Sequence, residues 1–301
     1  MNGLEGASLA SMPTNKLAVY AIPYVLIAAL QYQITKDGLR FADPIAFMAA
    51  RAVIASVVCF TLARSYKPII NRDTLLLSLS TWASTTFWIL GLEYVSPAQS
   101  AVLTYTMPLF AIPLSMLILK ERTSRLGWIG ALTGFSGVAI YGAALAGGGG
   151  SILGAVLTVI NAIFWGTYTV YFRKVRLQDR MRTLATQFLV VSLLFLPLLP
   201  FNFHASVTPE FVADLLYVSL IAGVTSFFLW LSMTRMETIA KLTTLVFAVP
   251  AASIVIQSLL TGELPGLASL LGFALMFVGI FVSRGRGGGL AEEVPSVSDS
   301  G

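Results

Sequence analysis

The segments LTYTMPLFAIPLSMLILKE (residues 103–121) and LVFAVPAASIVIQSLLTGE (residues 245–263) carry one pattern twice. Each is apolar, has a proline at its sixth position and ends in a glutamate, and the two lie 142 positions apart. A helix needs about 20 apolar residues to cross a bilayer core about 30 Å thick. The two segments are therefore predicted to be equivalent membrane-spanning helices, each interrupted where Pro108 or Pro250 removes a backbone hydrogen bond.

The composition of the whole chain also indicates a membrane protein. Of its 301 residues, 56% are hydrophobic and only 11% are charged, whereas a soluble domain carries roughly 25% charged residues. So few charges cannot cover a globule of this size. The formal net charge of +5 does not indicate nucleic-acid binding, because the basic residues punctuate apolar runs and do not gather on one face.

Apolar runs of spanning length recur along the chain between charged or turn-forming breaks. They predict ten transmembrane helices, an all-α integral membrane protein, because backbone groups in lipid must be satisfied within the segment. The predicted spans are approximately 17–35, 44–63, 74–92, 97–119, 124–145, 151–172, 182–200, 211–233, 238–260 and 265–283. Pro197 and Pro200 make the end of the span at 182–200 ambiguous.

The basic residues predict an orientation. Almost all lysines and arginines fall in the loops that share a side with both termini, and only Lys36 and Arg40 fall in loops of the other side. By the positive-inside rule both termini are expected in the cytoplasm. We expect a multi-pass protein of the cell (inner) membrane, with residues 1–16 as a cytoplasmic segment and residues 284–301 as a disordered tail.

The offset of 142 extends beyond the opening segments and divides the chain in two. It aligns Ala98 with Ala240, Gly130 with Gly272, and Gly137 with Gly279. We expect one five-helix repeat at 17–145, a Gly-rich connector at 146–150 and a second repeat at 151–283. Because five is odd, the second repeat enters the membrane inverted, and such repeats enclose a substrate site near the bilayer midplane. The alternative is a chance recurrence of proline and glycine in helical membrane sequence. Small residues such as Gly130, Gly134 and Gly137 are expected to let helices approach closely.

Two stretches carry a resemblance to a known family. YVSPAQSAVLTYTMPLFAIPLSMLILKERTSRLGWIGALTGFSGVAIYG (residues 94–142) and WGTYTVYFRK (residues 165–174) resemble the EamA-type members of the drug/metabolite transporter superfamily. The first half departs from the family's tryptophan–glycine pattern, with Ala28 and Ala29 at those positions, although Lys36 keeps its basic end. The resemblance implies ten helices in two halves and the movement of small solutes, and amino-acid export is common in that family.

Polar and aromatic side chains inside the spans are the candidate binding residues, because such groups turn toward a bundle interior or a wet cavity. Several recur at helical spacing along one stripe. The candidates are Tyr24, Gln31, Trp82, Thr86, Thr104, Asn161, Trp165, Tyr168, Trp230 and Phe247. For each threonine, a bond to its own helix is the alternative. For Trp88, we expect a place in an interfacial aromatic belt.

Pro108 and Pro250 are the candidate hinges. The carbonyl groups that they free, near Thr104 and Val246, either accept from a substrate or bond to a neighbour. Among charged residues, Lys36 is expected to extend to the interface, with attraction of anions as the alternative. Arg51 lies about seven residues, or roughly 10 Å, inside the second span. A structural ion pair with Glu93 is favoured for it over a substrate contact.

The residue types that the predicted spans lack exclude some classes of function. No acidic residue lies at the centre of a span, which favours uncoupled movement or exchange. His204 and Cys59 are the single histidine and cysteine, so we expect no catalytic set, metal or cofactor. The predicted function is a carrier that moves an amino acid or similar neutral or zwitterionic solute, outward, by alternating access. A nucleotide-sugar or other drug/metabolite transporter, with proton coupling, is the alternative. The expected partners are this solute and the lipid bilayer, and a homodimer is left open.

Overall fold

The computed structural model describes residues 14–146, 151–175, 179–201, 204–262 and 266–284, which are helical throughout with short connections and include no strand. In the first half the helices are α1 (Thr14–Gly38), α2 (Pro44–Leu62), α3 (Arg72–Tyr94), α4 (Pro97–Thr104), α5 (Pro108–Ile118) and α6 (Arg125–Ala146). In the second half they are α7 (Ile152–Lys174), α8 (Arg180–Phe195), η1 (Leu196–Phe201), α9 (Pro209–Leu216), η2 (Tyr217–Thr225), α10 (Ser226–Met233), α11 (Ile239–Leu245), α12 (Ala248–Thr261) and α13 (Leu267–Arg284). The predicted connector and disordered tail, and most of the predicted N-terminal segment, lie outside these residues.

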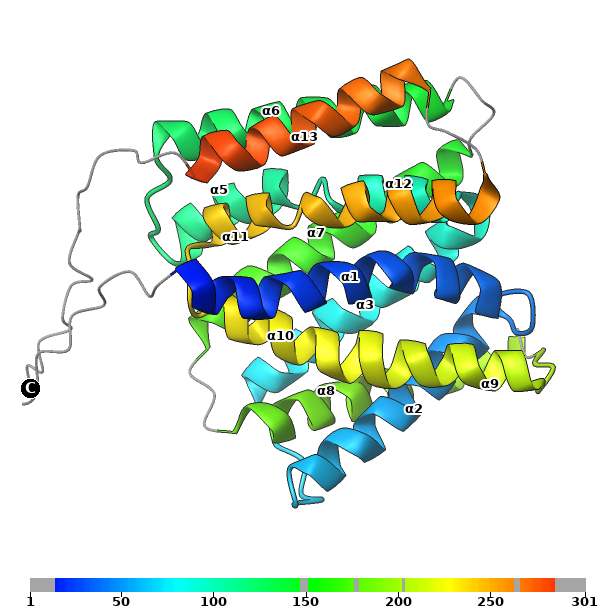
Figure 1. The fold of residues 1–301 in the computed structure, drawn as a ribbon. Helices are drawn as coiled ribbons and strands as arrows, with labels where there is room; N and C mark the ends of the chain where they lie inside the picture. Colours follow the sequence, from blue (N-terminus) through cyan, green and yellow to red (C-terminus); the bar gives the residue numbers. More distant parts are fainter. Residues whose placement is uncertain (1–13, 147–150, 176–178, 202–203, 263–265, 285–301) are drawn as a thin grey trace, which may run out of the picture.

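The helices are stacked in layers, as Figure 1 shows. The pair α6 and α13 forms one edge, and α5, α11 and α12 lie next to it. Helices α1, α3 and α7 occupy the middle, and α2, α8, α9 and α10 form the other edge. Helix α1 begins and α13 ends at the same end of the bundle. We call this the termini end and the opposite one the far end.

By length and composition, 8 helical segments of the described residues suffice to cross a membrane. They are Leu17–Gly38, Pro44–Leu62, Arg72–Tyr94, Pro97–Ile118, Ile152–Lys174, Arg180–Pro200, Pro209–Met233 and Ile239–Thr261. Each corresponds to one predicted span within a few residues. The predicted spans at 124–145 and 265–283 correspond to α6 and α13, which are helical but not among the 8; the apolar part of α13 is the shorter stretch Leu270–Val282.

Two of these segments are broken at equivalent places. The helical geometry is interrupted between α4 and α5, at residues 105–107 just before Pro108. It is interrupted again between α11 and α12, at residues 246–247 shortly before Pro250. The carbonyl of Thr104 accepts from the Met107 amide at 3.2 Å, and that of Val246 accepts from the Val249 amide at 2.9 Å. The carbonyls next to each break are therefore engaged within the chain, in the tight i to i+3 pattern. Of the two alternatives stated for these carbonyls, the structure shows the bond to a neighbour in the chain.

The segment α9–η2–α10 holds a distortion that the sequence did not indicate. Its central part, η2, is a π-helix of 9 residues. A π-helix shifts hydrogen bonding from i+4 to i+5 and commonly marks functional sites. A glycine at position 223 suits this turn, because a Cβ there would lie only 3.1 Å from the Val218 carbonyl oxygen.

Glycines bring α6 and α13 into close contact. A Cβ at Gly137 would lie 2.4 Å from the Gly272 carbonyl oxygen, and one at Gly279 would lie 2.6 Å from the Gly130 carbonyl oxygen. Neither distance leaves room for a side chain, so the two backbones approach each other directly. The predicted role of Gly130 and Gly137 in close helix approach is confirmed.

Candidate substrate-binding site

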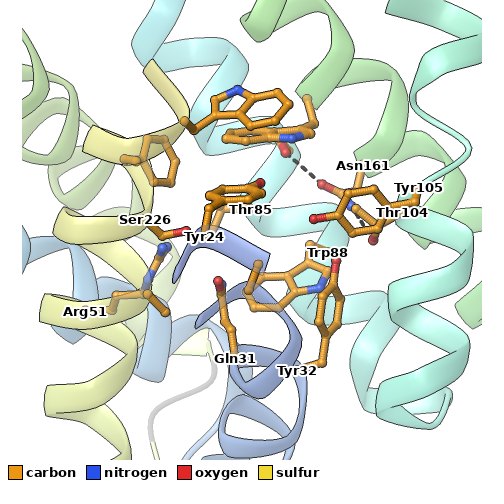
Figure 2. A pocket seen from close by; sticks show the side chains of 16 residues that line it. Tyr24, Gln31, Tyr32, Arg51, Thr85, Trp88, Thr104, Tyr105, Asn161 and Ser226 are labelled. Carbon is orange, nitrogen blue, oxygen red and sulfur yellow. Dashed lines mark hydrogen bonds between the residues drawn. The ribbon is translucent and has the colours of Figure 1, made fainter. Parts of the chain in front are cut away.

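A cavity of about 80 Å³ lies at the centre of the bundle, between helices of both halves of the chain (Figure 2). Its lining consists of aromatic, amide and hydroxyl side chains with one charged residue. The first half contributes Tyr24, Ala28, Gln31, Tyr32, Arg51, Ser84, Thr85, Trp88, Thr104 and Tyr105, and the second contributes Asn161, Trp165, Ala222, Ser226, Phe227 and Trp230. Such a mainly apolar cavity with a few polar groups is the usual form of a small-molecule site.

Helical spacing explains which side chains of α3 reach the cavity. Ser84, Thr85 and Trp88 lie within about 100° of one another around the helix, at 100° per residue. Trp88 is only 7% exposed and its indole nitrogen has no hydrogen-bond partner among the described residues. The prediction that Trp88 belongs to an interfacial belt is therefore wrong. Trp82 and Thr86 occupy the other side of α3 and do not line the cavity.

Asn161 joins three helices at the cavity wall. Its Oδ1 accepts from the Ser84 hydroxyl at 2.7 Å, and its Nδ2 donates to the Thr104 hydroxyl at 3.1 Å. A buried amide is costly unless it is hydrogen-bonded, and these two bonds fix α7 to α3 and α4. Asn161 thus positions the wall as well as lining it.

Aromatic rings form a continuous wall around the cavity. The Tyr24 and Trp230 rings stack at 5.2 Å between centroids, and Trp230 and Trp165 stack at 6.0 Å. Phe227 meets Trp165 edge to face at 5.3 Å. The Trp230 indole nitrogen donates to the Thr169 hydroxyl at 3.2 Å, which fixes the ring. The wall therefore presents rigid π faces suited to a flat or apolar body.

Arg51 is the one charged residue in the cavity lining. Its side chain is 4% exposed, and its Nε donates to the Val218 carbonyl in η2 at 3.1 Å. Figure 2 shows its guanidinium end beside Ser226, at the edge of the cavity. The predicted ion pair with Glu93 is wrong: the Arg51 guanidinium instead donates to the Val218 carbonyl and lies over the Phe188 ring, 6.0 Å from its centroid.

The other members of the predicted site lie outside the cavity. Tyr168 is fully buried behind Trp165, and its hydroxyl donates to Gln187 Oε1 at 3.1 Å. Phe247 packs on α6, where a Cβ at Gly134 would lie 2.3 Å from its ring. The Thr86 hydroxyl donates to the Trp82 carbonyl of its own helix at 2.7 Å, as the alternative for threonine stated. Of the ten predicted binding residues, the structure brings six together: Tyr24, Gln31, Thr104, Asn161, Trp165 and Trp230.

Basic residues close the two ends of the bundle in matching ways. At the far end the Lys36 ammonium donates to the carbonyls of Leu92 and Glu93, at 2.7 and 2.8 Å. At the termini end the Arg173 guanidinium donates to the carbonyls of Thr234, at 2.9 Å, and Glu237. These residues therefore cap the ends of neighbouring segments, a role that the predicted interfacial place of Lys36 did not include.

A carboxylate and an amide bind across the halves at the starts of the two short helices α11 and α4. At the termini end, Glu121 Oε1 lies 2.8 Å from Arg173 Nε, and its Oε2 accepts from the Ile239 amide at the start of α11 at 3.0 Å. Across the halves, Gln257 Oε1 of α12 accepts from the Ala98 amide at the start of α4 at 3.0 Å. Each half thus caps a short helix of the other half.

A second hollow of about 400 Å³ lies at the far end and includes Asp214, Asp37 and Lys36 in its lining. Asp214 Oδ2 is buried and has no hydrogen-bond partner among the described residues. Asp214 was not among the predicted site residues, and it lies only a few residues inside its predicted span. The described residues hold no group of three potential metal ligands.

Comparison with known proteins agrees with this fold and cavity. The EamA-like transporter family matches the chain twice, over residues 15–143 and 152–285. An uncharacterised transporter of Acidianus ambivalens is 47% identical over 238 residues, which cover 79% of this chain and 92% of the relative. The uncharacterised transporter YvbV of Bacillus subtilis is 25% identical over 89% of this chain and 92% of its own length.

Two further matches cover less of the chain or share less sequence identity with it. A riboflavin transporter of Vibrio cholerae is 35% identical over 116 residues, 38% of this chain and 36% of its own. A solved crystal structure with 19% identity superposes with a TM-score of 0.73 over 90% of this chain and 96% of its own. The latter likeness is one of fold alone.

The family match and the relatives that are named transporters make this chain a multi-pass helical membrane transporter and not an enzyme. The chain belongs to the EamA-like transporter family, which confirms the resemblance seen in the sequence.

Proposed function

We propose that this protein is a carrier that moves a small organic solute across the cell membrane through its central cavity. The observation that carries the proposal is the composition of the cavity wall, to which both matched halves of the chain contribute. A site enclosed between two repeats near the bilayer midplane is the arrangement on which carriers operate. The solute and the bilayer are then its partners, and a homodimer is not needed to complete the cavity.

We further propose the topology on which this mechanism depends. Ten helices form two inverted five-helix repeats, with α6 and α13 as the fifth helix of each. Both termini face the cytoplasm, so the termini end is the cytoplasmic end. The reciprocal contacts of Lys36 and Arg173 support the inversion, because equivalent residues of the two halves act at opposite ends of the bundle.

Alternating access follows from the contacts at the two ends. Glu121 and Arg173 hold the cytoplasmic end closed, and Lys36 and Gln257 hold the outer end. A cavity of about 80 Å³ is small beside the 300–1,000 Å³ of typical ligand pockets. The described cavity is therefore narrow, and a solute enters when one set of contacts opens while the other stays closed.

The cavity chemistry favours an amino acid or a similar solute. The wall combines hydroxyl and amide groups with stacked aromatic rings, and Arg51 is its one charged residue. A nucleotide sugar carries two phosphate charges and would call for several basic groups. We propose outward movement down a gradient or by exchange, since the cavity lining includes no acidic residue that could serve as a relay.

Counterflow in proteoliposomes tests this proposal. Purified protein is reconstituted, the vesicles are loaded with unlabelled phenylalanine or serine, and labelled amino acid is offered outside, with and without an imposed pH gradient. The proposal expects saturable accumulation that the gradient does not change. Accumulation that appears only with the gradient would replace exchange by proton coupling. An ionic conductance without solute saturation would indicate a channel.

A further inference from the structure

We infer that the cavity selects solutes by one carboxylate group, which the Arg51 guanidinium binds, and that it does not require an ammonium group on the same solute. The inference rests on the proposed carrier function and names the solute class of that site. It would be a small organic monocarboxylate with a flat apolar body. Aromatic amino acids belong to this class through their carboxylate.

Arg51 carries a buried positive charge that no acidic side chain of the described residues neutralises. Arg51 is 4% exposed. Its recorded contacts are the Val218 carbonyl, at 3.1 Å from Nε, Met48 Sδ, at 3.9 Å from Nη1, and the Phe188 ring, whose centroid lies 6.0 Å from the guanidinium carbon. Among the described residues no acidic side chain pairs with it. A charge at this depth calls for an opposite charge, because desolvation is costly without one.

The Arg51 guanidinium also has N–H donors that bond to no described residue. Arginine has five N–H donors in a planar fork that matches the two oxygens of a carboxylate. Nε is engaged with Val218, and Nη2 has no hydrogen bond to any described residue. Since Arg51 lines the cavity beside Ser226, these donors and the serine hydroxyl can meet one carboxylate from the cavity side.

The other residues of the cavity lining indicate which further groups the solute carries. Its lining includes no aspartate or glutamate that would pair with an ammonium group. The indole nitrogen of Trp88 is a second buried donor without a partner in the described part of the chain. Unpartnered donors and stacked rings suit an anion with a flat apolar body better than a cation.

Ligand binding to the purified protein in detergent tests the inference directly. Trp88, Trp165 and Trp230 line the cavity, so their fluorescence reports occupancy. The probes are 3-phenylpropionate, its neutral amide 3-phenylpropanamide, L-phenylalanine and phenethylamine. The two carboxylates should bind at least about tenfold more tightly than the amide and the amine, because hydrogen bonds between charged groups contribute the most.

Variants of Arg51 separate charge from packing. Arg51→Gln keeps a donor for the Val218 carbonyl but loses the charge, and Arg51→Lys keeps the charge. We expect Arg51→Gln to weaken 3-phenylpropionate binding about tenfold or more and to change amide binding less than about twofold, with Arg51→Lys between wild type and Arg51→Gln. Lys241→Gln is the matched control, since it removes an exposed positive charge outside the cavity lining, and it should bind like wild type.

The outcomes distinguish this inference from the carrier function. Equal affinity of the wild type for carboxylate and amide, or an Arg51→Gln variant that binds both as the wild type does, overturns the carboxylate inference. Saturable counterflow of a solute without a carboxylate, such as thymidine, together with no binding of the carboxylates, also overturns it but leaves the carrier. No binding and no counterflow of any solute overturns both.

Discussion

The Lys36 ammonium group donates a hydrogen bond of 2.7 Å to the carbonyl of Leu92, at the end of α3. Arg173 makes the equivalent bond, of 2.9 Å, to the carbonyl of Thr234, just after α10. Leu92 and Thr234 are separated by the same 142 positions as the two proline-containing segments. The donors Lys36 and Arg173 lie 137 positions apart, so the offset of 142 relates the acceptors of the two contacts and not their donors. The likeness of the two contacts supports the proposed inverted repeat.

The contact between Glu121 and Arg173 should control access from the termini end. Glu121→Gln keeps an acceptor for the Ile239 amide but loses its charge toward Arg173. The pair is only 26% and 11% exposed, and breaking it leaves the Arg173 charge without its partner, so this end should open about tenfold more often. The measurement is the labelling rate of Ser226→Cys, a cavity position, by a water-soluble maleimide in a Cys59→Ala background.

Lys241→Gln is the control for this experiment. It breaks the pair between Lys241 and Glu237, 3.4 Å apart and 58% and 33% exposed. Exposed pairs of this kind contribute only about 0–1 kcal/mol. Labelling should therefore stay near the parental rate. An equal increase in both variants would mean that the Glu121–Arg173 contact does not close the bundle.

The glycine contact between α6 and α13 should be required for stability. Gly279→Ala places a methyl group 2.6 Å from the backbone of Gly130 and Gly134, and overpacking of this kind costs about 1–3 kcal/mol. Its melting temperature in detergent should fall by several degrees. Gly266→Ala, where a Cβ meets nothing within 4 Å, should melt near the wild-type temperature. Unchanged melting of Gly279→Ala would contradict the close approach.

The π-helix should be required for the position of Arg51. A Cβ at Gly223 would lie 3.1 Å from the Val218 carbonyl and 3.8 Å from Nε and Nη2 of Arg51. Gly223→Ala should therefore weaken 3-phenylpropionate binding about fivefold, which corresponds to about 1 kcal/mol. Ile221→Ala is the control, because Ile221 belongs to the same π-helix but is 42% exposed. Unchanged affinity in Gly223→Ala would show that Arg51 tolerates a shifted Val218.

Asp214 should not couple transport to protons. It lies in the hollow at the far end, not in the central cavity. Asp214→Asn should leave counterflow at the wild-type rate within about twofold, because exchange needs no carboxylate relay. If the wild type follows an imposed pH gradient and Asp214→Asn does not, Asp214 is a coupling residue and the uncoupled mechanism is wrong.

The sequence predicted the helices well because their signals are local. Apolar runs, prolines and polar caps determined most helix boundaries within a few residues, and Pro108 marked a true break in its span. The π-helix at Tyr217–Thr225 has no comparable signal, since it depends on how α2 packs against it. A local pattern does not contain that information.

The binding site was predicted only in part, for a different reason. Trp82 was predicted as a binding residue and Trp88 as part of an interfacial belt, but position around the helix turns Trp88 and not Trp82 toward the cavity. Spacing from Ser84 and Thr85 would have separated the two. The partner of Arg51 could not be derived in this way, because depth along α2 says nothing about which helix lies beside it.

In the proposed function, the solute passes through the central cavity. Counterflow of labelled phenylalanine in proteoliposomes, compared among wild type, Trp165→Ala and Trp82→Ala, tests it most directly, because Trp165 lines the cavity and Trp82 does not. The account predicts saturable accumulation in the wild type and in Trp82→Ala, and at least about a tenfold loss in Trp165→Ala with normal incorporation into vesicles. Equal accumulation in Trp165→Ala and wild type would contradict it.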